Sequence, residues 1–280
     1  MTLFLGIDGG GSGCRAVLSD ADGLVFGRGA AGPCNIMSDR DGAIAALTAC
    51  AAEAMGGHDP KQVSAVLGLA GANTSGAAEW LPALLPFGRV RVLQDAQTAA
   101  AGALGPADGI VAAMGTGSVF IRQVAGQVVT IGGWGPVLSD EGSGNWLGRR
   151  WLSHVLRASD GLAPMTALIR ETLARHGGPS GIVRFARAAT GADFGREVPH
   201  LLAHRDDPAA SALLAKAAEV VAASVEILRQ QSAYPVVFTG GLGPIYAGLL
   251  AGRWQILSPL GDPLDGALAI ARADGPLITG

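Results

Sequence analysis

The sequence predicts a two-lobed α/β fold in which a βββαβα pattern occurs twice. The 280 residues, of which 49% are hydrophobic and 15% charged, are enough for two compact lobes with a substantial core. A short apolar segment, a glycine-rich turn at residues 6–13 and two further β-prone segments open the chain, and the same order starts again near residue 109. We interpret this recurrence as an internal duplication, with chance repetition of a common hairpin as the alternative.

The first glycine-rich turn predicts a phosphate-binding site. Residues 9–11 are consecutive glycines and Gly13 is a fourth, so the backbone amides of the turn can approach an anion closely. Asp8, just before them, would repel a phosphate unless a cation lay between the two, which suggests Mg²⁺. The alternative is a glycine-rich hairpin that binds no ligand.

Two better-known phosphate loops are excluded. A Walker A loop needs Gly-Lys-Ser/Thr, and neither Lys61 nor Lys216 follows a glycine. Residues 11–16 match a relaxed dinucleotide fingerprint, but that loop must open a helix, whereas residues 14–19 alternate like a strand. The turn is therefore predicted to join two strands.

The first lobe is expected to span residues 1–107. Tight turns join its first three β-prone segments, which predicts an antiparallel meander. Apolar residues at helical spacing, with Asp39 or Asp41 placed as a cap, predict the first helix. The expected strands are 3–8, 14–19, 24–30, 62–70 and 89–93, and the expected helices are 39–55 and a segment from Ser75 to about Leu85.

The second lobe is expected to span residues 108–280, with its last helix free to pack back on the first lobe. Residues 139–231 are expected to be mostly helical, and a second glycine-rich loop follows the last predicted strand. The expected strands are 109–114, 119–124, 127–131 and 235–239, and the expected helices are 145–157, 164–176, 208–231, a short one after 240–243, and 264–272.

Charge and cysteine usage narrow the function classes. The net charge is −3 and no basic block occurs, so neither nucleic acid nor a membrane surface is an expected partner. No apolar run of 18 residues exists, and Asp8 interrupts the place where a signal peptide would keep its apolar core, so a cytoplasmic location is expected. Cys14, Cys34 and Cys50 show no CxxC spacing, which fits packing roles in a reducing compartment.

Short motifs that follow one another along nearly the whole chain carry a family resemblance. They are GIDGGGSGCRAVL (6–18), CNIM (34–37), GLAGA (68–72), QDA (94–96), GTGS (115–118), GGWG (132–135), SDEGSG (139–144), TGGL (239–242) and DGALAIA (265–271). Together they resemble the actin, Hsp70 and sugar-kinase superfamily, with its ribonuclease H-like fold, and within it the BadF-type ATPase family. In that family the chain is similar to N-acetylglucosamine kinases and bacterial glucosamine kinases.

The resemblance implies an ATP site in a cleft between the lobes. Mg²⁺ would lie near Asp8, the adenosine would lean on the loop at 240–243, and the phosphates would contact both glycine turns, since phosphoryl transfer mainly requires positioning and charge neutralisation. The implied ATP-binding residues are Gly10, Gly11, Ser12, Gly13, Thr116, Gly117, Gly240 and Gly241.

The resemblance also implies a sugar site with Asp95 as the catalytic base. A carboxylate at a strand end can take the proton of the acceptor hydroxyl, and the alternative role of Asp95 is to cap a helix over 96–103. Considered singly, Asn35 could be a turn residue, Trp134 a core residue and Asp140 a helix cap. The implied sugar-binding residues are Asn35, Asp95, Thr116, Gly117, Ser118, Trp134 and Asp140.

The implied activity is ATP-dependent phosphorylation of the 6-hydroxyl of glucosamine or N-acetylglucosamine. The free amine and the N-acetyl form stay open, because Ala70 replaces a serine of the eukaryotic N-acetyl enzymes whereas Trp134 matches them. The alternative is an ATPase activase that couples hydrolysis to a redox or conformational step, but Cys14, Cys34 and Cys50 lie away from the positions that would hold its iron–sulfur cluster. The expected partners are a small sugar and ATP, and a homodimer is left open.

Overall fold

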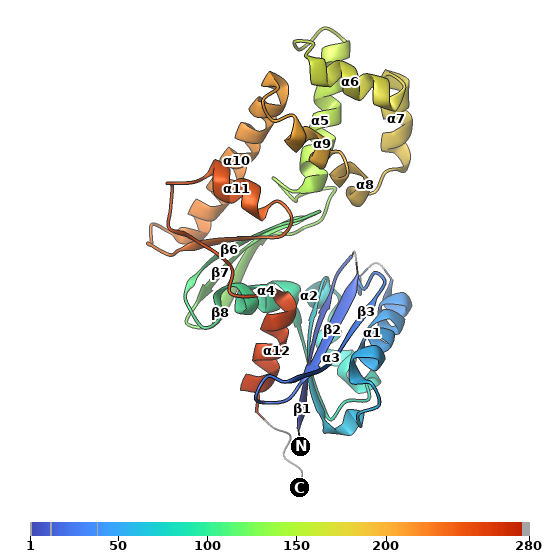
Figure 1. The fold of residues 1–280 in the computed structure, drawn as a ribbon, viewed down its shortest axis with the longest axis vertical. Helices are drawn as coiled ribbons and strands as arrows, with labels where there is room; N and C mark the ends of the chain where they lie inside the picture. The colour runs from blue at the N-terminus through green and yellow to red at the C-terminus, as the bar shows by residue number, and fades with distance from the viewer. Residues whose placement is uncertain (1, 12, 38, 276–280) are drawn as a thin grey trace. The chain divides into compact units, whose positions relative to one another are not determined.

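The computed structural model describes residues 2–11, 13–37 and 39–275, which form two compact units (Figure 1). The first unit takes in the described parts of 1–108, 123–128 and 258–280, and the second takes in 109–122 and 129–257. Each contains the greater part of one five-stranded sheet with helices packed on it. This architecture confirms the predicted α/β class.

The sheet of the first unit has the strand order β3-β2-β1-β4-β5. The first three strands form the predicted antiparallel meander, whereas β1, β4 and β5 are parallel. Every residue of β4 is buried, as expected of a strand covered on both faces. The strands, all predicted from the sequence, are β1 (Leu3–Gly9), β2 (Cys14–Ser19), β3 (Val25–Ala31), β4 (Val63–Leu69) and β5 (Arg89–Gln94).

The longer helices of the first unit agree with prediction, whereas the short η1 was not predicted and one predicted helix is broken. The single helix predicted from Ser75 to about Leu85 is wrong, because Gly76 adopts a left-handed φ of 63° and Pro82 lacks the amide that a continuing helix needs. The segment breaks into three short pieces instead. The helices are α1 (Arg40–Met55), η1 (Pro60–Gln62), α2 (Ala72–Ser75), α3 (Ala77–Trp80), η2 (Pro82–Leu84), α4 (Asp95–Leu104) and α12 (Pro263–Ala273).

The last helix, α12, packs on α4 and on β1. Glycines let the backbones of the two helices touch. A Cβ atom on Gly266 would lie 2.0 Å from the carbonyl oxygen of Thr98, and one on Gly102 would lie 1.9 Å from the carbonyl oxygen of Asp262. Any side chain at either glycine would therefore force the helices apart.

The sheet of the second unit has the strand order β10-β9-β6-β7-β8. β9 pairs parallel with β6 and with β10. The two residues of β10 were not predicted as a strand, because so short a segment leaves no alternation to recognise. The strands are β6 (Gly109–Met114), β7 (Ser118–Val124), β8 (Gln127–Gly132), β9 (Val236–Thr239) and β10 (Ile256–Leu257).

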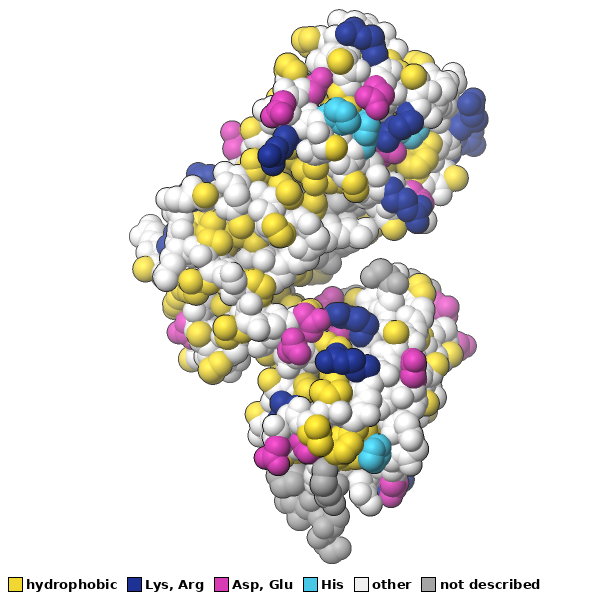
Figure 2. All heavy atoms as spheres, viewed as in Figure 1, with side chains coloured by type: hydrophobic (Ala, Val, Ile, Leu, Met, Phe, Trp, Pro, Cys, Tyr) yellow, Lys and Arg dark blue, Asp and Glu magenta, His cyan; other side chains and the backbone are white. Residues whose placement is uncertain are grey.

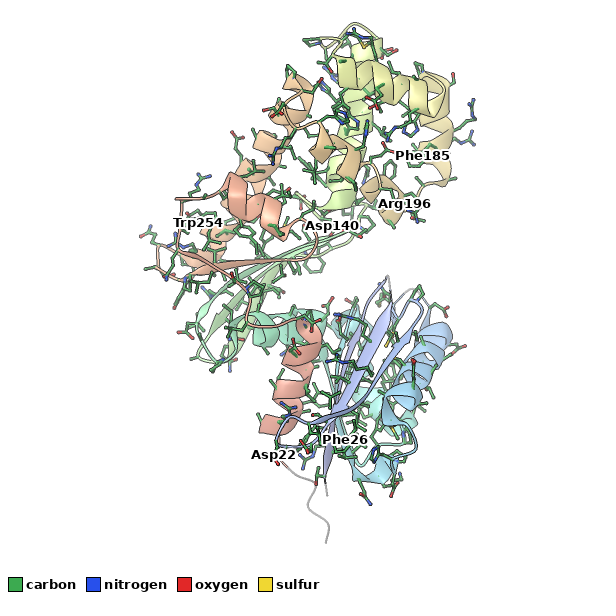
Figure 3. All side chains as sticks on the ribbon, in the orientation of Figure 1. Asp22, Phe26, Asp140, Phe185, Arg196 and Trp254 are labelled. Carbon is green, nitrogen blue, oxygen red and sulfur yellow. The ribbon has the colours of Figure 1, made fainter. Side chains whose placement is uncertain are left out.

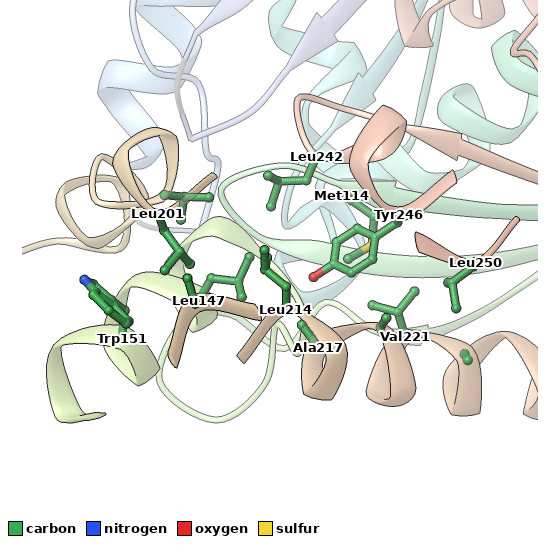
Figure 4. Close-up of a cluster of buried hydrophobic side chains, with 14 of the residues drawn as sticks. Met114, Leu147, Trp151, Leu201, Leu214, Ala217, Val221, Leu242, Tyr246 and Leu250 are labelled. Atoms are coloured by element: carbon green, nitrogen blue, oxygen red, sulfur yellow. The ribbon is translucent and has the colours of Figure 1, made fainter. Parts of the chain in front are cut away.

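The core of the second unit is formed by its sheet and by the helices packed around it, with α5 and α10 contributing many of the side chains (Figure 4). Trp151 and Tyr246 are fully buried there, and the Tyr246 hydroxyl donates to the carbonyl oxygen of Gly142 at 2.5 Å. The core is thus bonded to the loop that precedes α5. The helices are α5 (Gly144–Ser159), α6 (Ala167–His176), α7 (Pro179–Ala188), α8 (Gly191–Gly195), α9 (Val198–Ala203), α10 (Pro208–Arg229) and α11 (Gly243–Leu249).

The surface carries mixed charge. On the face shown in Figure 2, Lys and Arg side chains are scattered among acidic, polar and apolar groups. Within the part of the chain that the structure describes, no helix combines the length and the apolar character needed to cross a membrane.

Candidate active site

The glycine hairpin between β1 and β2 has open space where side chains would stand. The amide of Gly10 donates to the carbonyl oxygen of Gly13 (2.9 Å), and the amide of Cys34 donates to the carbonyl oxygen of Gly10 (2.8 Å). Apart from chain neighbours, no described atom lies within 4 Å of a Cβ built on Gly10 or Gly11. Packing does not explain these two glycines, whereas close approach of a ligand to this part of the backbone would. Ser12 lies outside the described residues.

Asp8 lies near the end of β1, and its side chain is 22% exposed. Its Oδ2 accepts a hydrogen bond from Nη2 of Arg15 at 2.7 Å, and the two residues are register partners across the hairpin. Among the described residues, no group of three or more His, Cys, Asp and Glu side chains is arranged to hold a metal. A single carboxylate that leaves the other positions to phosphate and water suits Mg²⁺, so this donor fits the predicted ion.

Asp8 and Asp95 share one edge of the first sheet. The register of the parallel strands aligns Gly9 with Leu69, and Leu69 with Gln94. Asp8 comes one residue before this row and Asp95 one residue after it, so both carboxylates stand at the carboxyl ends of the strands. They are close enough for the negative charge of Asp8 to affect the pKa of Asp95.

Asp95 is the first residue of α4, but it does not cap the helix. Gln94 is the N-cap and forms a capping box with Gln97, so the helix-cap alternative for Asp95 is wrong. One oxygen of Asp95, Oδ1, accepts from the amide of Ala96 at 2.8 Å. Burial raises the pKa of the Asp95 carboxyl, and the charge of Asp8 raises it further. A carboxylate with a raised pKa is a stronger base than an ordinary one.

Asn35 lies between β3 and α1, where it has a turn role. Its Oδ1 accepts from the amide of Met37 at 3.0 Å, and its carbonyl oxygen accepts from the amide of Asp39 at 3.2 Å. A Cβ on Gly71, just after β4, would lie 3.2 Å from Oδ1 of Asn35. Asn35 therefore has a turn role and lies at the same sheet edge as Asp8.

The second unit has a similar edge at the ends of β6 and β9. These strands are parallel, with Ala113 in register with Thr239, so the glycine loops that follow them lie together. A Cβ on Gly240 would lie 2.5 Å from the carbonyl oxygen of Met114, and Gly240 has a φ of 78°. Around Gly241, in contrast, no described atom lies within 4 Å of a built Cβ. Close packing thus requires the first glycine, and the second leaves a surface without a side chain.

Asp140 lies against the loop that follows β6 (Figure 3). It is 5% exposed, and its φ of 66° is left-handed, which is rare for a residue other than glycine. A Cβ on Gly117 would lie 2.9 Å from Oδ2 of Asp140, and the Ser118 hydroxyl donates to the carbonyl oxygen of Glu141 at 2.9 Å. The N-cap of α5 is Ser143, so the helix-cap alternative for Asp140 is wrong.

The surroundings of Asp140 disfavour its ionised form. Burial raises the pKa of its carboxyl, and hydrogen bonds from the amides of Ser118 and Gly135 oppose part of that rise. Thr116, exposed in the same loop, accepts from the amide of Asn145 at 3.1 Å through its carbonyl oxygen. Asp140 is thus a buried acceptor beside the predicted phosphate loop of this unit.

Trp134 is not a core residue. It is 79% exposed, and Val137 and Leu138 in the same loop are 79% and 84% exposed. The core alternative for Trp134 is therefore wrong. An indole presented to solvent is free to contact the apolar face of a sugar.

The predicted residues form two groups, one in each unit. The first group gathers at the carboxyl edge of the first sheet, and the second gathers around the loops after β6 and β9, with Trp134 on the exposed loop nearby in sequence. The groups are Asp8, Gly10, Gly11, Gly13, Asn35 and Asp95 in the first unit, and Thr116, Gly117, Ser118, Asp140, Gly240 and Gly241 in the second.

Sequence reasoning missed Arg15 and Asp262. Arg15 contacts Asp8 on one side and Asp262 on the other. The first contact follows from counting residues across the predicted hairpin, which places Arg15 opposite Asp8. The second joins residues 247 positions apart and leaves no local signal.

Two units, each with a sheet that carries a glycine loop at the carboxyl ends of its parallel strands, form the fold that solved sugar-kinase structures share. The chain belongs to the BadF/BadG/BcrA/BcrD ATPase family, whose sequence profile matches residues 5–248. The family resemblance drawn from the motifs is therefore confirmed.

Two named relatives are similar to this chain in sequence, and a solved structure is similar to it in fold. A Vibrio cholerae protein named glucosamine kinase GspK is 29% identical, over 97% of this chain and 96% of that protein. An N-acetylmuramic acid/N-acetylglucosamine kinase of Clostridium acetobutylicum is 32% identical, over 60% of this chain and 58% of that protein. The crystal structure of a candidate N-acetylglucosamine kinase from Chromobacterium violaceum matches with a TM-score of 0.88 at 30% identity, over 97% of this chain and 99% of that one.

Proposed function

We propose that the protein is an ATP-dependent amino-sugar kinase that phosphorylates the 6-hydroxyl of glucosamine or N-acetylglucosamine. The observation that carries the proposal is the sheet edge of the first unit, which combines the partly buried carboxyl of Asp95, the acid Asp8 and a glycine hairpin with open space around Gly10 and Gly11. Membership of an ATPase family supports ATP as the nucleotide. Relatives named as kinases of glucosamine and of N-acetylglucosamine support an amino sugar as the acceptor.

The nucleotide would be bound mainly by backbone groups. Amides of the hairpin at 10–13 and of the loop at 115–118 bind the phosphates, because fixed N–H dipoles stabilise negative charge without reorganising. Gly240 and Gly241 leave a flat surface for the adenosine. Asp8 would hold Mg²⁺, which when bound neutralises charge on the phosphates.

Asp95 acts as the general base. Its carboxylate takes the proton of the sugar 6-hydroxyl while that oxygen forms a bond to the γ-phosphorus. The bond between this phosphorus and the bridging β–γ oxygen breaks, and ADP leaves. Because Gln94 caps α4, the Asp95 carboxylate is not occupied as a helix cap and can serve the acceptor hydroxyl.

Polar and aromatic side chains orient the sugar. Asn35 and Asp140 exchange hydrogen bonds with ring hydroxyls, and Trp134 covers an apolar face of the sugar or of its acyl group.

A cytoplasmic location is part of the proposal and is supported by three free, buried cysteines, as expected in a reducing compartment. A homodimer stays a prediction.

The proposal is tested by coupled ADP production with ATP and Mg²⁺ against glucosamine, N-acetylglucosamine, N-acetylmannosamine, muramic derivatives and glucose. ADP release is expected to depend on glucosamine or N-acetylglucosamine. Asp95→Asn is expected to lower this sugar-dependent release at least ~100-fold while nucleotide binding is kept, because the variant loses only the proton acceptor. Asp59→Asn, an exposed cap in the same unit, serves as the matched control. Near-normal turnover of Asp95→Asn, or no response to either amino sugar, would contradict the proposal.

A further inference from the structure

Arg15 connects the C-terminal helix to Asp8. Its Nη2 donates to Oδ2 of Asp8 at 2.7 Å, and its Nη1 donates to Oδ2 of Asp262 at 2.8 Å. One guanidinium therefore bridges two carboxylates, one from β1 and one from the start of α12. The three side chains together carry one net negative charge.

The two oxygens of Asp262 have separate partners. Oδ1 caps α12 by accepting from the amides of Leu264 (2.9 Å) and Asp265 (3.1 Å), while Oδ2 accepts from Arg15. The amide of Asp262 donates to the Asp265 side chain at 2.9 Å and completes a capping box. These bonds fix the orientation of the carboxylate that faces Arg15.

The start of α12 is also fixed in position. The close contact of Gly102 with the carbonyl group of Asp262, and of Gly266 with α4, leaves no room for the helix to move towards α4. Because α4 begins at Asp95 and α12 also packs on β1, Asp262 is held in a constant relation to both acids of the sheet edge.

Stability does not explain this network. The side chains of Arg15, Asp8 and Asp262 are 50%, 22% and 44% exposed. Ion pairs with this much exposure contribute little to the free energy of unfolding, because water already solvates both partners.

We propose that Asp262 is a positioning residue that acts through Arg15 on the metal-binding carboxylate of Asp8. A pair of Asp8 and Arg15 alone would have no net charge, and the guanidinium would compete with a cation for Asp8. By binding the other side of the guanidinium, Asp262 keeps Arg15 from neutralising Asp8 and leaves a net negative charge for the cation. The inference rests on the proposed role of Asp8 in holding the Mg²⁺ of bound nucleotide.

The test measures binding of Mn²⁺, as a paramagnetic substitute for Mg²⁺, to the ADP-bound protein by electron paramagnetic resonance. Asp262→Asn keeps a side chain that caps helices well but loses the bond to Arg15, and it is expected to weaken Mn²⁺ binding about tenfold. The matched control is Asp274→Asn, which breaks the 2.8 Å pair of Arg91 and Asp274 at the other end of the same helix and is expected to change binding less than about twofold.

A double-mutant comparison separates the bridge from general damage to α12. In an Arg15→Gln background, adding Asp262→Asn is expected to change Mn²⁺ binding less than about twofold, because the guanidinium is already gone. Arg15→Lys leaves α12 untouched and tests the bridge again, since an ammonium group does not reproduce the two-sided fork of a guanidinium. It is expected to weaken Mn²⁺ binding at least about threefold.

The outcomes decide the inference without depending on the sugar. Each of four outcomes would overturn the inference. Asp262→Asn and Arg15→Lys could bind Mn²⁺ as the wild type does, or Asp274→Asn could lose as much binding as Asp262→Asn. The full loss could persist in the Arg15→Gln background, or the wild-type ADP complex could bind no Mn²⁺. In the kinase assay, Asp262→Asn is expected to lower kcat/KM for the nucleotide and to leave the sugar KM within about twofold. Failure of every sugar to stimulate ADP release would refute the proposed kinase activity and leave the Mn²⁺ comparison valid.

Discussion

The two sheet edges share parallel strands and glycine loops but differ in how they hold their acidic residues. In the first unit, Asp8 and Asp95 come directly from strand ends, and an arginine contacts Asp8. In the second, Asp140 is carried by a loop, has a left-handed φ and is nearly fully buried. The two edges thus resemble each other more in their backbone loops than in their side-chain chemistry. The edge of the first unit presents acidic side chains from strand ends, whereas the edge of the second unit presents one nearly buried acid from a loop.

The largest expected effect concerns the charge of the first edge. Asp8→Asn is expected to lower turnover on the order of 10²-fold, because the variant removes the proposed cation ligand and its electrostatic contribution. Asp22→Asn, in the exposed turn between β2 and β3, is the matched control. Steady-state rates over a range of Mg²⁺ concentrations give the measurement. If the two variants had the same rate, the first edge would have no special electrostatic role.

The second expected effect is a dependence of stability on pH, caused by the burial of Asp140 at the edge of the second unit. Because burial raises the folded-state pKa of Asp140 above its ordinary 3.8, the wild type loses stability as pH rises from the ordinary pKa through the raised one. Asparagine has no such titration. The difference in Tm, Asp140→Asn minus wild type, should therefore become more positive between pH ~4 and pH ~7. Calorimetry at both pH values measures it, with the exposed Asp206→Asn as the control. A difference that is flat or becomes more negative would contradict the assignment.

The first edge was more predictable from sequence than the second, and the reason is local. The strand end before Gly9 and the strand end before Asp95 can be recognised within a few residues, and the structure has both. Asp140 and Ser143 are both good capping residues only three apart, and only the folded loop shows that Ser143 caps α5. At α4 the residue type favours Asp95 as the cap, and only the folded chain shows that Gln94 takes this place.

The individual contacts made by distant segments were beyond sequence reasoning, although a return of the last helix to the first lobe was allowed for. The contact between Arg15 and Asp262 depends on α12 returning to the first unit, and nothing near either residue encodes it. The broken helix after Ser75 is the opposite case, because Gly76 and Pro82 were visible breakers whose effect exceeded that of the apolar spacing around them.

The smallest expected effect separates binding from stability in the second unit. Trp134→Ala is expected to raise the sugar KM about threefold, because the proposed indole contact covers only one face of the sugar. Its Tm is expected to stay within about 1 °C of the wild type, because a side chain that is 79% exposed contributes little packing to the folded state. Leu162→Ala removes another exposed apolar side chain of this unit, 63% exposed, and should change neither value. Sugar titrations and thermal unfolding of the two variants decide the matter. A large fall in Tm with an unchanged KM would show that Trp134 has a structural role instead. The sugar would then contact the second unit through Asp140 and the backbone of its loops.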